Sequence, residues 1–139
     1  MNTTVEQAIE RFAVTVDEHL DRQATVPVVD FARQGDVIVI PSRIARDALP
    51  AMTPVPAHGV PVVRGENGGN THLLLADGDV RFDARTASAT DLTLGRLTVG
   101  EGSTAYLAHP EHGYVGIVPG TYTVRRQREQ ADELRMVAD

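Results

Sequence analysis

Three histidines are the side chains in this sequence whose types and spacing could do chemistry. His109 and His112 lie three residues apart with Glu111 between them, and His72 follows the glycine-rich run of residues 65–70. Three imidazoles can hold a divalent metal ion and leave one position open for water or a substrate. The pattern therefore predicts a metal site at His72, His109 and His112 if the fold brings the two segments together. The alternative is that these histidines cap loops and hydrogen-bond to the backbone.

Arginines towards the C-terminus offer a second kind of chemistry. In the strand expected over residues 121–127, the face that begins with Tyr122 and Val124 ends with Arg126. An arginine buried there needs a carboxylate, because an unpaired buried charge is prohibitively costly. The candidate partners are Glu66, Glu111 and Asp77. We expect a salt-bridge network at the rim of the fold or, alternatively, a ligand or partner contact made by Arg126, Arg128, Glu66 and Glu111.

The composition excludes or disfavours several other functions. The chain has no cysteine, which excludes disulfides, thiolate metal sites and a cysteine nucleophile. It carries no familiar nucleophile motif or phosphate-binding loop, so no catalytic residue is assigned. The formal net charge of -6 and the few aromatic residues disfavour nucleic-acid binding. An RNA- or nucleic-acid-binding module that uses Arg125, Arg126 and Arg128 stays as an alternative.

The elements that must position these residues begin with a helix. Apolar residues recur at helical spacing from Val5 to Leu20, and Thr3 with Glu6 has the spacing of a capping box. These features predict one amphipathic helix over residues 4–22. Its apolar stripe must be buried, because a lone helix of this length is marginal in water. We expect it to pack on the rest of the chain; the alternative is docking onto a partner or a sister subunit.

The remaining chain has the pattern of a β protein. Residues 36–41 and 72–76 are apolar on both faces, which predicts strands that are covered on both sides. Turn signals at short intervals then separate five further runs of strand length. These runs are residues 80–84, 92–99, 104–108, 114–118 and 121–127. A short turn of helix over 129–134 and a last strand over 135–138 are also expected.

The fold class is therefore mainly β: a small antiparallel β-barrel or sandwich with one N-terminal amphipathic α-helix. Residues 1–24 form the helix and link, and residues 25–139 a single β domain. The proline-rich segment 50–61 is expected to be a loop or an edge. No run approaches the eighteen or so apolar residues that span a bilayer, so we expect a cytoplasmic protein without membrane contact.

Two resemblances follow from these motifs. The first is a partial resemblance to the metal-binding motifs of cupins. It is carried by Asn70-Thr71-His72, by Asp77 and by the later histidines His109 and His112. This resemblance implies a divalent metal in a β-barrel. Residues 35–41, 65–72 and 109–139 more closely resemble a family of small, uncharacterised bacterial and phage-associated proteins. That resemblance implies a β fold beyond residue 34 with the helix as an extension. Members of that family usually carry a histidine where this chain has Asn70.

Three functions are compatible with the sequence. We expect a non-enzymatic accessory or assembly protein without a cofactor, which forms a homo-oligomer or docks onto a protein partner through its helix and apolar strand faces. The first alternative is a metal-dependent, cupin-like enzyme or sensor that uses His72, His109 and His112. The second is the nucleic-acid-binding module described above.

Overall fold

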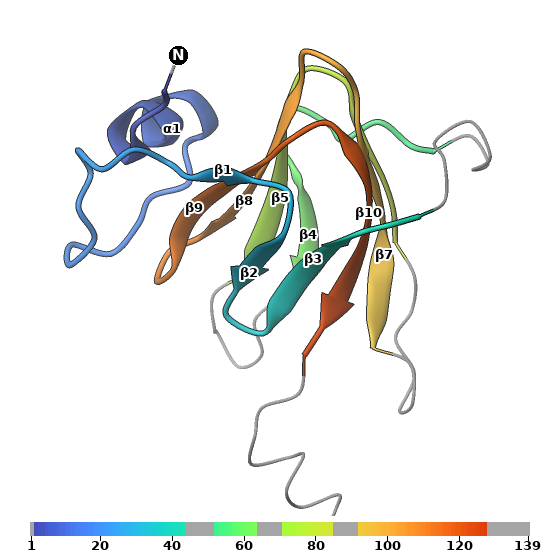
Figure 1. Ribbon diagram of the computed structural model, residues 1–139. Helices are drawn as coiled ribbons and strands as arrows, with labels where there is room; N and C mark the ends of the chain where they lie inside the picture. The colour runs from blue at the N-terminus through green and yellow to red at the C-terminus, as the bar shows by residue number, and fades with distance from the viewer. Residues whose placement is uncertain (1, 44–51, 64–70, 85–91, 128–139) are drawn as a thin grey trace, which may run out of the picture.

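The protein is a β-sandwich of two five-stranded sheets with a short N-terminal helix on one side (Figure 1). The computed structural model describes residues 2–43, 52–63, 71–84 and 92–127. Sheet I has the strand order β1-β9-β8-β5-β4, and sheet II has the order β2-β3-β10-β7-β6. Neither order returns to its first strand, so the fold is a sandwich and the barrel alternative does not apply.

The strands of sheet I are β1 (Val28–Val29), β4 (Val60–Val63), β5 (His72–Asp77), β8 (Thr104–His109) and β9 (Gly113–Ile117). The strands of sheet II are β2 (Ala32–Gln34), β3 (Val37–Pro41), β6 (Val80–Ala84), β7 (Thr93–Val99) and β10 (Gly120–Arg126). All pairings are antiparallel except that of β1 with β9.

The seven strands predicted within residues 36–127 are all present, each within one residue of its predicted ends. The sequence patterns missed β1 and β2, because two or three residues are too few to show alternation. They also missed β4, which begins at the end of the proline-rich segment. Because β4 is the last strand of sheet I, its Pro61 lies where a missing N–H is tolerated. The elements expected over 129–138 lie outside the described residues.

The core lies between the sheets and is built by alternate residues of each strand. Leu74 and Leu107 from sheet I meet Val39, Leu97 and Val124 from sheet II, and all five are almost fully buried. Such β-branched and aliphatic side chains pack well on a pleated surface. Residues in phase with these positions therefore also point between the two sheets.

The helix α1 (Val5–Phe12) is much shorter than the predicted span of 4–22. It ends because Ala13 adopts a left-handed conformation, with φ of 62°, and donates its N–H to the carbonyl of Ile9. The capping box is formed by Thr4 and Gln7, one residue later than the predicted pair Thr3 and Glu6. No helix in the described ranges has the length and hydropathy needed to cross a membrane.

The N-terminal segment packs on the outer face of sheet I in its own chain (Figure 1). Val5, Ala8 and Val16 form a second apolar cluster with Leu75 and Tyr106. The hydroxyl of Tyr114 in the same cluster donates a 2.6 Å hydrogen bond to the Val14 carbonyl. Burial raises the pKa of Tyr114 to about 12. The prediction that the helix packs on its own domain, and that β5 is covered on both faces, is therefore confirmed.

Enlarging Ala8, which is fully buried on the side of α1 that faces sheet I, is expected to destabilise the protein. Ala8→Leu should lower the free energy of unfolding by about 1–3 kcal/mol, because it overpacks the contact between α1 and sheet I. Urea unfolding measures this change. Glu10→Leu is the matched control, since Glu10 is exposed on the same helix. Equal stabilities of the two variants would contradict the packing described here.

Candidate functional site

Strand phase and register bring His72 and His109 together at one end of the sandwich. His72 begins β5 in phase with the core residue Leu74, and His109 ends β8 in phase with Leu107. The two strands pair Leu73 with Ala108, and continuing this register by one residue sets His72 opposite His109. The ring centroids are 4.3 Å apart, and both residues are buried. The two imidazoles thus lie between the sheets.

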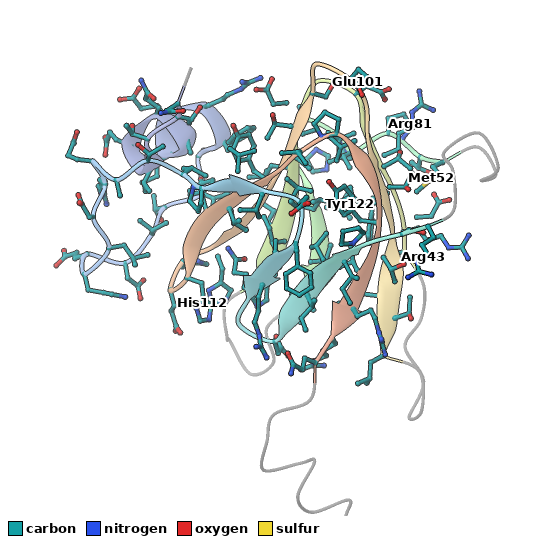
Figure 2. All side chains as sticks on the ribbon, in the orientation of Figure 1. Arg43, Met52, Arg81, Glu101, His112 and Tyr122 are labelled. Carbon is teal, nitrogen blue, oxygen red and sulfur yellow. The ribbon has the colours of Figure 1, made fainter. Side chains whose placement is uncertain are left out.

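His112 joins them from the turn between β8 and β9. Its ring centroid lies 4.6 Å from that of His109 and 6.0 Å from that of His72, and its side chain is exposed. Figure 2 shows His112 at the end of the sandwich opposite Glu101. We call His72, His109 and His112 the histidine cluster. The structure therefore brings together the three histidines that the sequence singled out.

Sheet II contributes two further polar residues through the hairpin that joins β2 to β3. Gly35 has a φ of +58° and Asp36 does not have a positive φ, which is the pattern of a type II′ turn. A Cβ at Gly35 would lie 3.1 Å from Nε2 of His112 and 3.2 Å from Cε1 of His72. Glycine is therefore required at this position both for the turn and for the close approach to the cluster.

Gln34 determines which nitrogen of His72 carries a proton. Its side-chain nitrogen donates two hydrogen bonds of 3.0 Å across the sandwich, to the carbonyls of Leu107 and Gly113. Both amide N–H groups are then used, and the amide oxygen, 3.0 Å from Nδ1 of His72, can only accept. Nδ1 of His72 therefore carries the proton, and in the neutral ring Nε2 has the free lone pair.

This arrangement predicts a defined tautomer for His72. Long-range ¹⁵N–¹H spectra of the protein at neutral pH should show His72 protonated at Nδ1. In Gln34→Met, which removes the acceptor, this preference should be lost. The free energy of unfolding of this variant should be lower by about 1–3 kcal/mol, since two buried carbonyls lose their donor. A wild-type His72 protonated at Nε2 would contradict the assignment.

Asp36 lies between His72 and Arg126. Its Oδ1 is 3.6 Å from Nε2 of His72, and its Oδ2 accepts a 2.7 Å hydrogen bond from Nε of Arg126. Arg126 is half-exposed at the rim, where it is the last residue of β10. Arg126 therefore makes a salt bridge at the rim of the fold, as expected, and is not buried in the core.

Of the partners predicted for Arg126, Asp77 pairs with Arg11 instead. The carboxylate that accepts from Arg126 in the described residues is that of Asp36. The pairing of β10 with β3, which sets Arg126 beside Val37, places the guanidinium next to Asp36. Glu66 and Arg128 lie outside the described residues.

His72 is neutral at physiological pH. Burial, with the neighbouring His109 as the second cause, lowers the pKa of His72 from 6.5 to about 4, although Asp36 acts in the opposite direction. A neutral ring with a protonated Nδ1 presents the lone pair of Nε2 to a carboxylate oxygen. Two hydrogen-bond acceptors thus face each other at 3.6 Å.

His109 has the opposite tautomer preference. Its Nδ1 accepts a 3.1 Å hydrogen bond from the backbone N–H of Glu111. In a neutral ring this leaves the proton on Nε2, which then has no lone pair for a metal ion. His109 is therefore the least suited of the three histidines to act as a ligand through Nε2.

The cluster as it stands does not have the geometry of a complete metal site. In the described parts of the chain, no group of three or more His, Asp or Glu side chains is placed to hold a metal ion. The pair formed by His72 Nε2 and Asp36 Oδ1 is nevertheless close to ligand spacing. A tetrahedral ion with bonds of about 2.0–2.2 Å holds two ligand atoms about 3.4 Å apart.

Sequence reasoning missed Gln34 and Asp36 as site residues. The signal that could have found them is Gly35-Asp36 itself, since a glycine followed by a polar residue between two short apolar runs is typical of a hairpin turn. Such a turn at a sheet end places its flanking side chains near the loops of the facing sheet.

Arg125 and Arg126, the two described arginines of the nucleic-acid alternative, do not share one surface. Arg125 pairs with Ile38, and the neighbouring Val37 and Val39 point into the core, so Arg125 lies on the outer face of sheet II. Arg126 points instead towards Asp36 at the rim. The two charges are therefore separated by the sheet.

Comparison with known proteins gives one family match. Residues 33–127 match the model of a family described as a domain of unknown function, DUF8820. No curated protein and no solved structure matches the chain, and none of the comparisons supports a relation to cupins. The matched range contains the histidine cluster, Gln34, Asp36 and Arg126, and it leaves out α1.

Proposed function

Since this chain belongs to the DUF8820 family, whose function is not known, its role has to be argued from its own side chains, and we propose that it binds a divalent transition-metal ion. The first two ligand atoms are Nε2 of His72 and Oδ1 of Asp36. The ion would lie at the end of the sandwich, between the β2–β3 hairpin and the histidine cluster.

The observation that carries this proposal is the pair of acceptors facing each other at 3.6 Å. A lone pair and a carboxylate oxygen at this distance repel each other unless a proton, a cation or a water molecule that donates to both lies between them. The lowered pKa of His72 means that no proton is supplied at neutral pH. A metal ion would satisfy both atoms at once.

Gln34 supports the proposal through its hydrogen bond to Nδ1, the ring nitrogen of His72 that would not bind the metal. Metal-binding histidines usually donate their second ring N–H to a carbonyl, carboxylate or water, which fixes the ring and its tautomer. The amide oxygen of Gln34 accepts the Nδ1 proton of His72 in the same way. The ring is thus oriented with Nε2 towards Asp36.

His112 is the third ligand in this proposal. Its ring lies within 10° of parallel to that of His72, and its exposed side chain can rotate about its own bonds. Two imidazoles and one carboxylate form a ligand set that is used for zinc and for non-haem iron, with an open position for water or substrate. His109 packs between the two ligands as a neighbour.

Titration of the metal-free protein with Co²⁺ tests the proposal. One equivalent should bind and give the visible absorption of a four- or five-coordinate ion, and His72→Gln should abolish this binding. His58→Gln is the matched control, because His58 is exposed and precedes the end of β4 that pairs with Leu74 and not with His72. If wild type and His72→Gln bind Co²⁺ equally, the metal site is not where we propose it.

Assembly with a second copy or a protein partner is a second candidate function. It is supported by exposed apolar side chains and not by the helix, which the sequence analysis had also considered. The apolar side of α1 is buried in its own chain, whereas Val28 and Phe31 are 49% and 55% exposed where the chain passes from sheet I to sheet II. A homo-oligomer or a protein partner would use this corner. Sedimentation of wild type and Phe31→Ser should then differ in mass.

A further inference from the structure

The outer face of sheet II carries three arginines close together. Arg33 of β2 and Arg125 of β10 both pair with Ile38 of β3, so they lie on either side of it, about 10 Å apart. Arg96 of β7 pairs with Thr123 of β10 and is therefore diagonal to Arg125. A residue next to each arginine in its strand belongs to the core, so all three arginines point away from the core. We call Arg33, Arg96 and Arg125 the basic face.

The charges of the basic face are not paired with carboxylates in the part of the chain that the structure describes. Arg96 and Arg125 make no ion pair there, and Arg33 donates to the neutral amide of Gln127. Asp83 lies opposite Arg96 in the register, but its Oδ1 accepts from a backbone N–H instead. Arg33 and Arg125 are exposed. Three like charges at this spacing repel one another, so the basic face favours an anionic partner.

Three carboxylates of the same chain lie on the opposite side of the sandwich. Asp17, Glu18 and Asp21 are exposed, and none of them is in an ion pair within the described ranges. We call these three residues the acidic segment. Val16 and Leu20 belong to the apolar cluster on the outer face of sheet I, so they hold the acidic segment on that side (Figure 1). The two outer faces of the sandwich thus carry charges of opposite sign.

The basic face and the acidic segment cannot meet within one molecule, because the two sheets lie between them (Figure 1). Two copies can bring them together if the acidic segment of one copy lies on the basic face of the next. Such a contact uses different surfaces on the two copies, so it leaves one basic face and one acidic segment free at the ends. Contacts of this kind continue to a ring or an open filament and do not stop at a dimer.

We infer that the basic face binds the acidic segment of a second copy of this chain, so that the protein associates head to tail. Three arginines meet three carboxylates, and the contact covers Ile38 and Ile40, which are partly exposed on the same face. A second copy is favoured over a nucleic acid because one contact then accounts for the unpaired charges of both surfaces, whereas a nucleic acid would satisfy the basic face alone. The inference depends neither on the metal site nor on the apolar corner at Val28 and Phe31.

Sedimentation velocity of the full chain over a range of protein concentrations, with a chelator present, tests this inference. In about 10 mM salt, where charges interact over about 30 Å, species larger than a dimer should increase with protein concentration. In about 1 M salt, where this range falls to about 3 Å, the protein should be a monomer.

Two double variants remove one surface each. Arg96→Gln with Arg125→Gln neutralises most of the basic face, and Asp17→Asn with Glu18→Gln neutralises most of the acidic segment. Each should raise the dissociation constant about 10-fold, since each removes two exposed ion pairs. An equimolar mixture of the two variants should form a 1:1 dimer and nothing larger, because it retains one intact basic face and one intact acidic segment for each pair of chains.

The matched control is Arg11→Gln with Arg22→Gln. It also removes two positive charges, but it removes them from the N-terminal segment, where these arginines make exposed ion pairs with Asp77 and Glu6. The control should associate at least as tightly as wild type, because its N-terminal segment is more negative.

A wild type that is monomeric at every concentration in low salt overturns the inference. So does association that is unchanged in the two charge variants, that is weakened equally in the control, or that grows beyond a dimer in the mixture. Association that survives about 1 M salt and is lost in Phe31→Ser belongs to the apolar corner and also overturns it. If the monomeric wild type binds a fluorescent single-stranded RNA oligonucleotide and Arg96→Gln with Arg125→Gln does not, the basic face is a nucleic-acid site and the inference is wrong.

Discussion

As the pH falls from 6.5 to 4, the free energy of unfolding of the metal-free protein is expected to decrease by about 3 kcal/mol because of His72 alone. The fold lowers the pKa of His72 from 6.5 to about 4. The unfolded chain takes up a proton on His72 near pH 6.5, whereas the folded chain resists it down to about pH 4. The stabilisation is therefore present above pH 6.5, falls as the pH drops through this window, and does not fall further below it.

Urea unfolding at half-unit intervals of pH, in the presence of a chelator, measures this effect. His72→Gln should show a pH dependence that is shallower by about 3 kcal/mol over the window, because glutamine does not titrate. His58→Gln should follow wild type. Parallel curves for wild type and His72→Gln would mean that His72 has an ordinary affinity for protons in the fold.

Asp36→Asn is expected to weaken metal binding strongly with little change in stability. The variant keeps the shape of the side chain but removes the charge that faces Nε2 of His72. We expect Co²⁺ affinity to fall by more than the roughly 10- to 100-fold that outer-shell changes cost. The lost ion pair with Arg126 is half-exposed and contributes at most about 1 kcal/mol.

Asp77→Asn is the matched control for this measurement. Asp77 is also a carboxylate paired with an arginine, Arg11, but it lies at the far end of β5 from His72. Calorimetric titration with Co²⁺ should separate the two variants clearly. Equal metal affinities would show that the charge of Asp36 has no part in binding.

The strands could be predicted because their burial alternates. Tyr122 and Val124 are buried as the alternation indicated, and the doubly apolar run at 72–76 is covered on both faces. The length of the helix could not be predicted in this way. Val16 and Leu20 continue the helical spacing, yet they join the second apolar cluster from an irregular segment. A periodic pattern therefore indicates which side chains are buried, but it does not show where the helix ends. The left-handed Ala13 ends it while the apolar spacing continues.

The site was predictable only in part, because it depends on register. The types and local spacing of the histidines singled them out, but their meeting follows from the pairing of Leu73 with Ala108. The contact of Arg126 with Asp36 joins residues 90 positions apart and follows from the pairing of β10 with β3. Local patterns do not contain these long-range pairings. Gln34 was missed for the same reason, since its partners lie on the facing sheet.

The most direct test of the metal site is a crystal structure of the cobalt-loaded protein with anomalous diffraction data. The proposal predicts one strong anomalous peak about 2.0–2.2 Å from both Nε2 of His72 and Oδ1 of Asp36, with Nδ1 of His72 still bonded to Gln34. A fully loaded crystal with no peak between these two atoms, or with its peak at exposed histidines such as His19 and His58, would contradict it.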